Sequence, residues 1–179
     1  ISYINNKFEI DRIISFKGIK QGIENTNYLL KSKNKKFILT IFEKRVAKKE
    51  IPFFMKLMDQ LNSANINCPK PLKNKDGNYL IRIKNKTACI VSFLNGKDKK
   101  TLNLKNCYDI GKMIAQMHLS SKKINLYRKN SMGIKNLNPL LNSIKFKSKK
   151  FINIKKFLKN NFRDIKKKWP KELPNGIIH

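Results

Sequence analysis

The six-residue run at 37–42, Phe-Ile-Leu-Thr-Ile-Phe, limits the possible folds more than any other feature of this sequence. It is rich in β-branched and aromatic residues and is apolar at nearly every position, a pattern typical of a strand covered on both faces. Shorter apolar runs at 13–16 and 27–30 precede it, separated by glycine-containing or polar turns. The three runs predict an antiparallel meander.

The rest of the first half predicts one helix and two more strands. We expect a helix over residues 48–64, because apolar residues recur there every three to four positions and Pro52 falls in the first turn, where its missing N–H costs least. Further strands are expected at 79–83 and 88–94, after a proline-containing connection and an Asp-Gly turn. The sequence therefore predicts five strands, with the helix inserted after the third.

The second half is predicted to be helical. Apolar residues recur at helical spacing over 104–121 and 151–169, and the segment 122–139 between them is expected to be a loop. Strands followed by helices are the α+β pattern. We expect a β-rich lobe over residues 1–95 and a helical lobe over residues 96–179.

The net charge of +30 suggests nucleic acid as a partner, but its make-up favours another explanation. Of the 41 basic residues 36 are lysine, and Lys, Asn and Ile, which all have A/T-rich codons, make up 83 of the 179 residues. Arginine would be expected on a surface selected for nucleic acid, because its planar fork pairs phosphates and bases bidentately. The dispersed lysines favour base composition as the cause, and a basic nucleic-acid-binding module stays open as an alternative.

Cysteine spacing and hydropathy indicate the cellular compartment in which the protein is expected. Cys68, Cys89 and Cys107 form no C-x-x-C pair, which argues against a disulfide framework and against a zinc site. No apolar run approaches the roughly 18 residues of a membrane span. We therefore predict a cytoplasmic protein without a membrane partner.

The clearest candidate for chemistry is the connection at 18–27 between the first two strands. Gly18 and Gly22 flank a polar turn, so backbone N–H groups there can approach a phosphate, although an ordinary hairpin would carry the same glycines. The sequence has no Ser/His/Asp order, no H-E-x-x-H motif and no carboxylate pair at a suggestive spacing. From the residues alone, the sequence indicates a two-lobed, basic α+β protein with a hint of phosphate affinity.

Several strings, taken in order, resemble the homoserine kinases that share the aminoglycoside-phosphotransferase fold. The most specific are residues 22–27, Gly-Ile-Glu-Asn-Thr-Asn, and residues 169–179, which run from Trp-Pro to the final His. Relatives that phosphorylate aminoglycosides or choline share the fold but usually lack these two strings. The other matching segments are residues 15–18, 38–46, 51–54, 68–71, 90–96 and 111–119.

The resemblance implies a protein-kinase-like, two-lobed fold that uses ATP and Mg²⁺ to phosphorylate the hydroxyl of L-homoserine, the step before threonine synthase. It implies that the β-rich lobe covers the nucleotide and that the linker after the fifth strand contacts the adenine. The cofactor-binding residues that it implies are Gly22, Glu24, Asn25 and Asn27 on the hairpin loop, Thr40 on the third strand, Lys44 and Arg45 after it, and Ser92, Phe93 and Leu94 on the linker.

One implied residue departs from the wider fold. Thr40 stands where many relatives place a lysine or arginine for the phosphates, although threonine is typical of this subfamily. Lys44 or Arg45 would then supply the charge, with Glu50 as the nearest helix carboxylate to orient it.

Other interpretations stay open beside homoserine phosphorylation. Within the same class the acceptor could be another small hydroxylated molecule, such as an aminoglycoside or choline, because acceptor identity is set mainly in the helical lobe. A noncatalytic, pseudokinase-like binder is a third interpretation. The resemblance implies no metal-binding residue within this sequence.

The catalytic loop of the family has the form His-x-Asp-x-x-x-x-Asn, and His179, the last residue, matches its first position. We therefore expect these 179 residues to be a fragment that lacks the catalytic Asp and a short stretch before Ile1, with apolar helix faces left exposed. Phosphoryl transfer needs positioned Mg²⁺ and an oriented hydroxyl. We predict no catalysis by this chain alone; homoserine-dependent formation of ADP by residues 1–179 would overturn that expectation.

Overall fold

A computed structural model describes residues 1–20, 24–43, 47–130, 133–144, 149–170, 172–173 and 176–177. The chain divides into two compact units, one of residues 1–127 with 176–179 and one of residues 128–175. The lobe boundary expected at 95/96 differs from the boundary between these two units and stays a prediction. In the described part of the chain, no helix is both long and apolar enough to cross a membrane.

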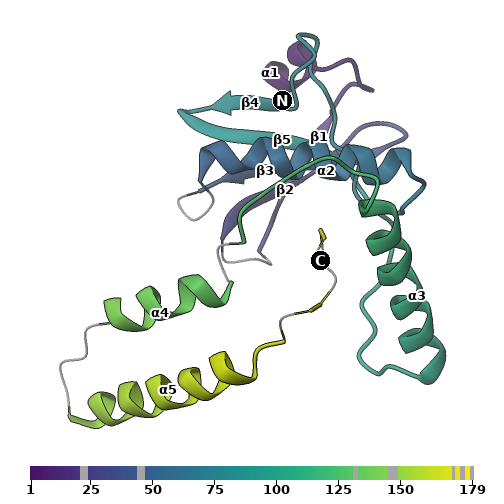
Figure 1. Cartoon of the computed structure of the whole chain (residues 1–179). Coiled ribbons are helices and arrows are strands. Elements are labelled where there is room, and N and C mark those ends of the chain that lie inside the picture. The colour runs from purple at the N-terminus through teal and green to yellow at the C-terminus, as the bar shows by residue number, and fades with distance from the viewer. Residues whose placement is uncertain are drawn as a thin grey trace. The chain divides into compact units, whose positions relative to one another are not determined.

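A five-stranded antiparallel sheet forms the centre of the first unit (Figure 1). The run at 37–42 lies in the middle strand of this sheet. That strand pairs on one side with the strand before it in the chain and on the other with the fifth strand in the chain. Five strands with a helix after the third are thus confirmed. The strands are β1 (Ser15–Ile19), β2 (Asn25–Lys31), β3 (Lys36–Phe42), β4 (Leu80–Ile83) and β5 (Lys86–Ser92), in the spatial order β1-β2-β3-β5-β4.

Both faces of β3 are covered, as its apolar run predicts. On one face, α1 (Ser2–Lys7) contributes Ile4 to a buried cluster that contains Leu39. On the other face, α2 (Ile51–Ser63) contributes Ile51 and Met55, which pack with Ile38 and residues of β4 and β5. The alternation of side chains along the strand sends odd-numbered residues of β3 towards α1 and even-numbered residues towards α2.

The ends of α2 follow from local chemistry. A 3₁₀ turn, Lys48–Glu50, leads into the helix, and Pro52 lies in its first turn. At the other end Asn65 adopts a φ of 60°. The Ile66 N–H donates to the Leu61 carbonyl at 2.9 Å, and the Asn65 N–H donates to the Asn62 carbonyl at 2.9 Å. These two bonds form a Schellman motif, for which asparagine is the usual substitute for glycine.

Several sequence predictions were wrong in detail. The first strand runs from Ser15 to Ile19 instead of over 13–16, and the last ends at Ser92 instead of Leu94. The six-residue α1 was not predicted, because a helix of that length shows too little periodicity. The segment 122–139, expected to be a loop, contains the start of α4 (Ile134–Ser143).

The second unit consists of α4 and α5 (Lys149–Lys168). Half-buried residues of α4 recur at helical spacing, and the helix forms in spite of Pro139 in its interior. The Lys155 ammonium on α5 donates to the Ile144 carbonyl at 2.7 Å and to the Asn142 carbonyl at 3.3 Å. It thereby satisfies carbonyls at the end of α4 that the helix leaves unpaired.

The helix α3 (Leu104–Ser121) belongs to the first unit and has the predicted bounds. It begins with a capping box in which the Asn103 side chain accepts from the Asn106 N–H at 2.9 Å. Large apolar side chains on it are exposed, with Leu104 at 90% and Tyr108 at 69%. This agrees with the expectation that its apolar residues are left uncovered in this chain.

A hydrogen bond between Tyr79 and Asp59 joins α2 to the sheet and yields a pH-dependent prediction. The Tyr79 hydroxyl donates to Asp59 Oδ2 at 2.6 Å, and burial, together with the Asp59 carboxylate, raises the pKa of Tyr79 from 10.0 to about 12. Because the folded-state pKa is the higher one, the stabilisation is present below pH 10 and is lost as the pH rises towards 12. Tyr79→Phe should lower the free energy of unfolding at pH 7 by about 1 kcal/mol.

Urea unfolding of Tyr79→Phe and the parent protein at pH 7 and at pH 11 checks this prediction. The difference in unfolding free energy between the two should shrink at the higher pH, since lysine titration is common to both proteins and cancels. Tyr127→Phe is the matched control, because its side chain is 88% exposed. A difference that is the same at both pH values would contradict the assignment of the hydrogen bond.

Candidate functional site

Polar side chains lie on the α2 side of the sheet, on strands β2 and β3. Asn27 is directly opposite Thr40 in the strand register, and both are half-buried. Thr40 shares this face with Ile38 and Phe42, which pack near α2, while Leu39 belongs to the cluster on the other face. Asn25 precedes Asn27 by two residues and therefore lies on the same face. Three of the predicted nucleotide-binding residues, Asn25, Asn27 and Thr40, are thus brought together on one face. We call these three residues the polar row.

The side chains in this row are uncharged. The Thr40 hydroxyl donates to Asn27 Oδ1 at 2.8 Å, so each fixes the rotamer of the other, and the Asn27 amide nitrogen can still donate. On its other side Thr40 is opposite Cys89, where burial raises the thiol pKa to about 12. The thiol is therefore protonated at neutral pH. The side chains of Asn25, Asn27 and Thr40 can bind an anion by hydrogen bonds but not by an ion pair.

A carboxylate at the end of β3 connects three strands. The Thr26 hydroxyl donates to Glu43 Oε1 at 2.9 Å, and the Lys86 ammonium donates to Glu43 Oε2 at 2.6 Å. The Glu43 backbone N–H donates to Asn25 Oδ1 at 3.4 Å. The start of β2, the end of β3 and the start of β5 therefore meet at Glu43, next to the connection between β1 and β2.

The sequence analysis did not single out Glu43. Its partners on β2 and β5 are 17 and 43 residues away in the chain, so the contacts depend on a strand register that the sequence does not specify. The one feature of the sequence that could have drawn attention to Glu43 is that it is an acidic residue directly after a predicted strand, in a chain with only 11 Asp and Glu residues.

The predicted adenine linker begins where β5 ends. The Ser92 hydroxyl oxygen accepts from the Lys70 N–H at 2.8 Å, and the Ser92 N–H donates to the Lys70 carbonyl at 2.8 Å. The Phe93 N–H donates to the Lys36 carbonyl at 3.2 Å. These bonds hold the chain up to Phe93, and the next residue, Leu94, is exposed.

The linker and the polar row are at different positions along the strands. Ser92 is opposite Phe37, and Asn27 is opposite Thr40, so the two positions are three residues apart along β3. At the rise of a strand this separation is about 10 Å. The linker and the polar row could therefore contact different parts of one extended ligand.

Other predicted residues are placed only in part. Glu24 is exposed directly before β2, and Glu50 is half-buried at the N-cap of α2. Gly22, Lys44, Arg45 and His179 lie outside the described residues. Among the residues that are described, no three His, Cys, Asp or Glu side chains gather to hold a metal ion.

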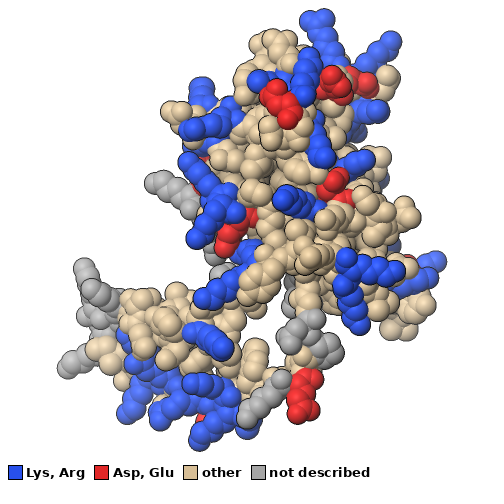
Figure 2. All heavy atoms as spheres, turned by 45° about the horizontal axis from the view of Figure 1, so that its top comes forward, with Lys and Arg blue, Asp and Glu red and all other residues tan. Residues whose placement is uncertain are grey.

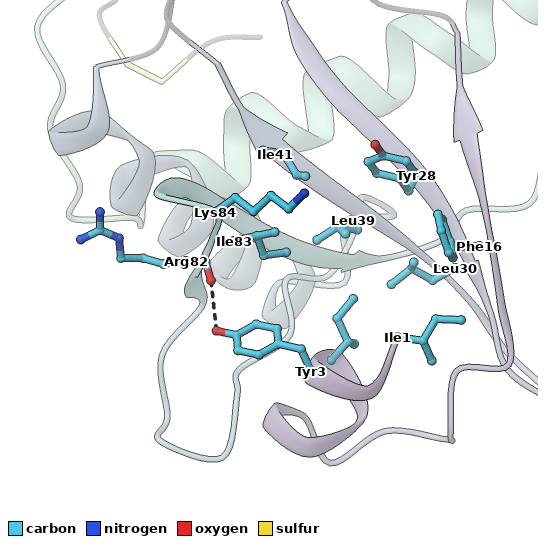
Figure 3. Close-up of a pocket in the computed structure, with 11 residues that line it drawn as sticks. Ile1, Tyr3, Phe16, Tyr28, Leu30, Leu39, Ile41, Arg82, Ile83 and Lys84 are labelled. Atoms are coloured by element: carbon cyan, nitrogen blue, oxygen red, sulfur yellow. Dashed lines mark hydrogen bonds between the residues drawn. The ribbon is translucent and has the colours of Figure 1, made fainter.

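Two hollows in the first unit contain none of the predicted site residues. One has a volume of about 450 Å³ and lies between α1 and the sheet, on the face opposite Thr40; Phe16, Tyr28 and Leu39 help to line it. Figure 3 shows the Lys84 side chain extending over this cavity, while Arg82, whose carbonyl accepts from the Tyr3 hydroxyl at 3.1 Å, points away. The other hollow, about 750 Å³, lies where α2 and α3 end.

The distribution of basic side chains does not identify the site. On the face that Figure 2 shows, Lys and Arg side chains lie over both units, with acidic side chains among them. This distribution agrees with the dispersed lysines of the sequence and does not by itself point to a partner.

The model of one protein family, described as the phosphotransferase enzyme family, matches residues 15–179. Homoserine kinases of Parvibaculum lavamentivorans and Paramagnetospirillum magneticum are 34% and 37% identical to this chain over 173 and 177 residues. These matches cover 96% and 97% of this chain but 54% and 53% of the two kinases. The chain thus spans about half the length of the curated relatives it matches.

Solved structures agree on the fold. Amicoumacin kinase in complex with AMP-PNP, Ca²⁺ and Ami matches with a TM-score of 0.69 at 12% identity, over 95% of this chain and 52% of that chain. Spectinomycin phosphotransferase in complex with ADP and spectinomycin matches with a TM-score of 0.62 at 16% identity, over 96% and 58%. The expected α+β, kinase-like fold is confirmed. With a family model that matches nearly the whole chain, this protein belongs to the phosphotransferase enzyme family.

Proposed function

We propose that the complete protein transfers a phosphoryl group from ATP to the hydroxyl of L-homoserine, giving O-phospho-L-homoserine for threonine biosynthesis. The observation that carries this proposal is the 34–37% identity with proteins named homoserine kinase over nearly all of this chain. The solved phosphotransferases that act on antibiotics match at 12–16% identity and support only the fold.

The polar row on the α2 side of the sheet is our proposed place for the nucleotide phosphates. The Asn27 amide N–H would bind them, with Thr40 holding the Asn27 side chain in place and with Glu24 and Asn25 beside the loop that carries Gly22. The adenine would lie at Ser92, Phe93 and Leu94. Because the Phe93 N–H already donates to Lys36, the exposed Leu94 backbone is the better candidate for the contact with the base.

The negative charge of the phosphates needs a positively charged partner, which Asn27 and Thr40 do not supply. We propose that Lys44 or Arg45, which directly follow Glu43 in the chain, provides it. Mg²⁺ would arrive with ATP and neutralise charge on the transferred phosphoryl group. The described residues do not fit a metal site of their own, so they are proposed to bind the nucleotide and not the ion. His179 is proposed to begin the catalytic loop.

An assay of ADP formation by the complete polypeptide tests this function. With ATP and Mg²⁺, we expect ADP to form faster on addition of L-homoserine than with choline or an aminoglycoside, and mass spectrometry should detect O-phosphohomoserine. A reaction without any acceptor controls for hydrolysis of ATP. Faster turnover with another acceptor would favour the alternative substrates, and no nucleotide turnover with any acceptor would contradict the kinase proposal.

The variant Thr40→Val extends the same assay to the site. It keeps the shape of the side chain but removes the hydrogen bond to Asn27, so the KM for ATP should rise about two- to fivefold, as expected for one neutral hydrogen bond. Thr101→Val, the same change at an exposed position outside the sheet, should leave the KM unchanged. Equal values for both variants would argue against the proposed role of the row.

A further inference from the structure

We propose that the cavity between α1 and the sheet binds a small apolar carboxylate, on the face of the sheet opposite the proposed nucleotide site. The cavity has a volume of about 450 Å³, and small-molecule sites span about 300–1,000 Å³. One turn of a helix with its side chains already fills about 500 Å³. The volume therefore favours a small molecule over a segment of another protein. This inference does not depend on the proposed function.

The walls of the cavity present apolar side chains that the protein leaves partly exposed. The first three strands contribute Phe16, Tyr28 and Leu39, as Figure 3 shows. The rings of Phe16 and Tyr28 are in edge-to-face contact, with their centroids 5.8 Å apart. Phe16 is 59% exposed, and Tyr3 of α1, which also lines the cavity, is 44% exposed. Because contact with water is unfavourable for such surfaces, they are suited to the apolar part of a ligand.

The mouth of the cavity is positively charged. Among the described residues that line the cavity, the charged ones are Arg82 and Lys84. The Lys84 side chain extends over the cavity, whereas Arg82 points away (Figure 3). In the described part of the chain the Lys84 ammonium has no carboxylate partner, while Lys86, two residues further on, is paired with Glu43 at 2.6 Å. Lys84 is therefore available to pair with an anionic group of a ligand.

The backbone holds Lys84 at this position. Lys84 and Asn85 form the turn between β4 and β5, with φ values of 45° and 64°. Two consecutive left-handed residues are typical of a type I′ hairpin turn, in which asparagine and glycine are preferred over longer side chains. The first position of this turn carries a lysine although the local backbone favours asparagine. A binding role for the ammonium group would account for that choice.

These features define the chemical class of the ligand. Its apolar body would lie against Phe16, Tyr28 and Leu39, and its head group would reach Lys84. A single ammonium group matches a single negative charge, since Arg82 is directed away from the cavity. A carboxylate fits this site better than a doubly charged phosphate, half of whose charge would stay unpaired.

Titration calorimetry of the complete polypeptide with octanoate, octanol and octylamine tests this inference, because the three probes share one apolar chain and differ in charge. One octanoate should bind per chain, about tenfold more tightly than octylamine, whose ammonium group would face that of Lys84. Hexanoate, which is two methylenes shorter, should bind about four- to fifteenfold more weakly than octanoate.

Two variants test the head-group and the body contacts separately. Lys84→Asn removes the charge and suits the left-handed backbone, so it should weaken octanoate binding about three- to tenfold and leave octanol binding unchanged. Phe16→Ala removes part of the apolar wall and should weaken both probes about three- to tenfold. Phe16 is exposed on an edge strand, which limits the effect of its truncation on folding.

Lys33→Asn is the matched control for the change of charge. Lys33 is exposed in the turn between β2 and β3, at the end of the sheet away from the β4–β5 turn. This variant should bind octanoate as the parent protein does.

Three results would overturn the inference. Equal affinities for octanoate and octylamine would contradict recognition of the charge by Lys84. Octanoate binding that is unchanged in both Lys84→Asn and Phe16→Ala would place the probe elsewhere on this basic protein. Absence of octanoate binding, as would follow if another part of the complete polypeptide filled the cavity, would exclude the site. None of these results bears on the proposed transfer of phosphate from ATP.

Discussion

The packing of both faces of β3 is the constraint on which the rest of the first unit depends. Its backbone pairs with β2 on one side and β5 on the other, and its side chains enter two separate apolar clusters. Ile38 faces the cluster with α2, whereas Leu39 faces the cluster with α1. A one-residue slip of the strand would exchange the two faces, so the register is strongly specified. That register also places Thr40 opposite Asn27.

The same alternation gives the two faces of the sheet different roles. The α1 side contains a cavity lined largely by apolar residues near Phe16 and Tyr28, while the α2 side has the hydrogen-bonded pair Asn27 and Thr40. Asn25, Asn27 and Thr40 carry no charge, and the Glu43 carboxylate, which follows β3, is engaged by Thr26 and Lys86. A phosphate site here would therefore need its positive charge from residues outside this row, for which Lys44 and Arg45 are our proposed source.

Much of this fold follows from sequence patterns, and the exceptions have physical reasons. The run 37–42 and the helix at 104–121 were predicted within one residue, because apolar periodicity is strong in both. The end of β5 at Ser92 was missed because it depends on a pair of hydrogen bonds to Lys70, 22 residues away in sequence. The helix containing Pro139 was missed because packing against α5 outweighs a local breaker.

The candidate site was harder to predict from the sequence than the fold was. Spacing alone gave only a glycine-containing turn, and the resemblance to homoserine kinases supplied Asn25, Asn27 and Thr40 as a set. Their adjacency depends on strand register, as does the ring of contacts around Glu43. Side chains that are far apart in sequence and meet across three strands leave no local pattern for a sequence reader to recognise.

Hydrogen–deuterium exchange of the complete polypeptide, with and without ATP and Mg²⁺, tests the central claim that nucleotide binds on the α2 side of the sheet. We predict slower exchange in peptides that contain residues 24–27, 38–42 and 92–94, and no change in α1 or around Lys84. Protection of α1 and Lys84 alone would instead place the ligand in the cavity on the opposite face, and would contradict the site described for this protein.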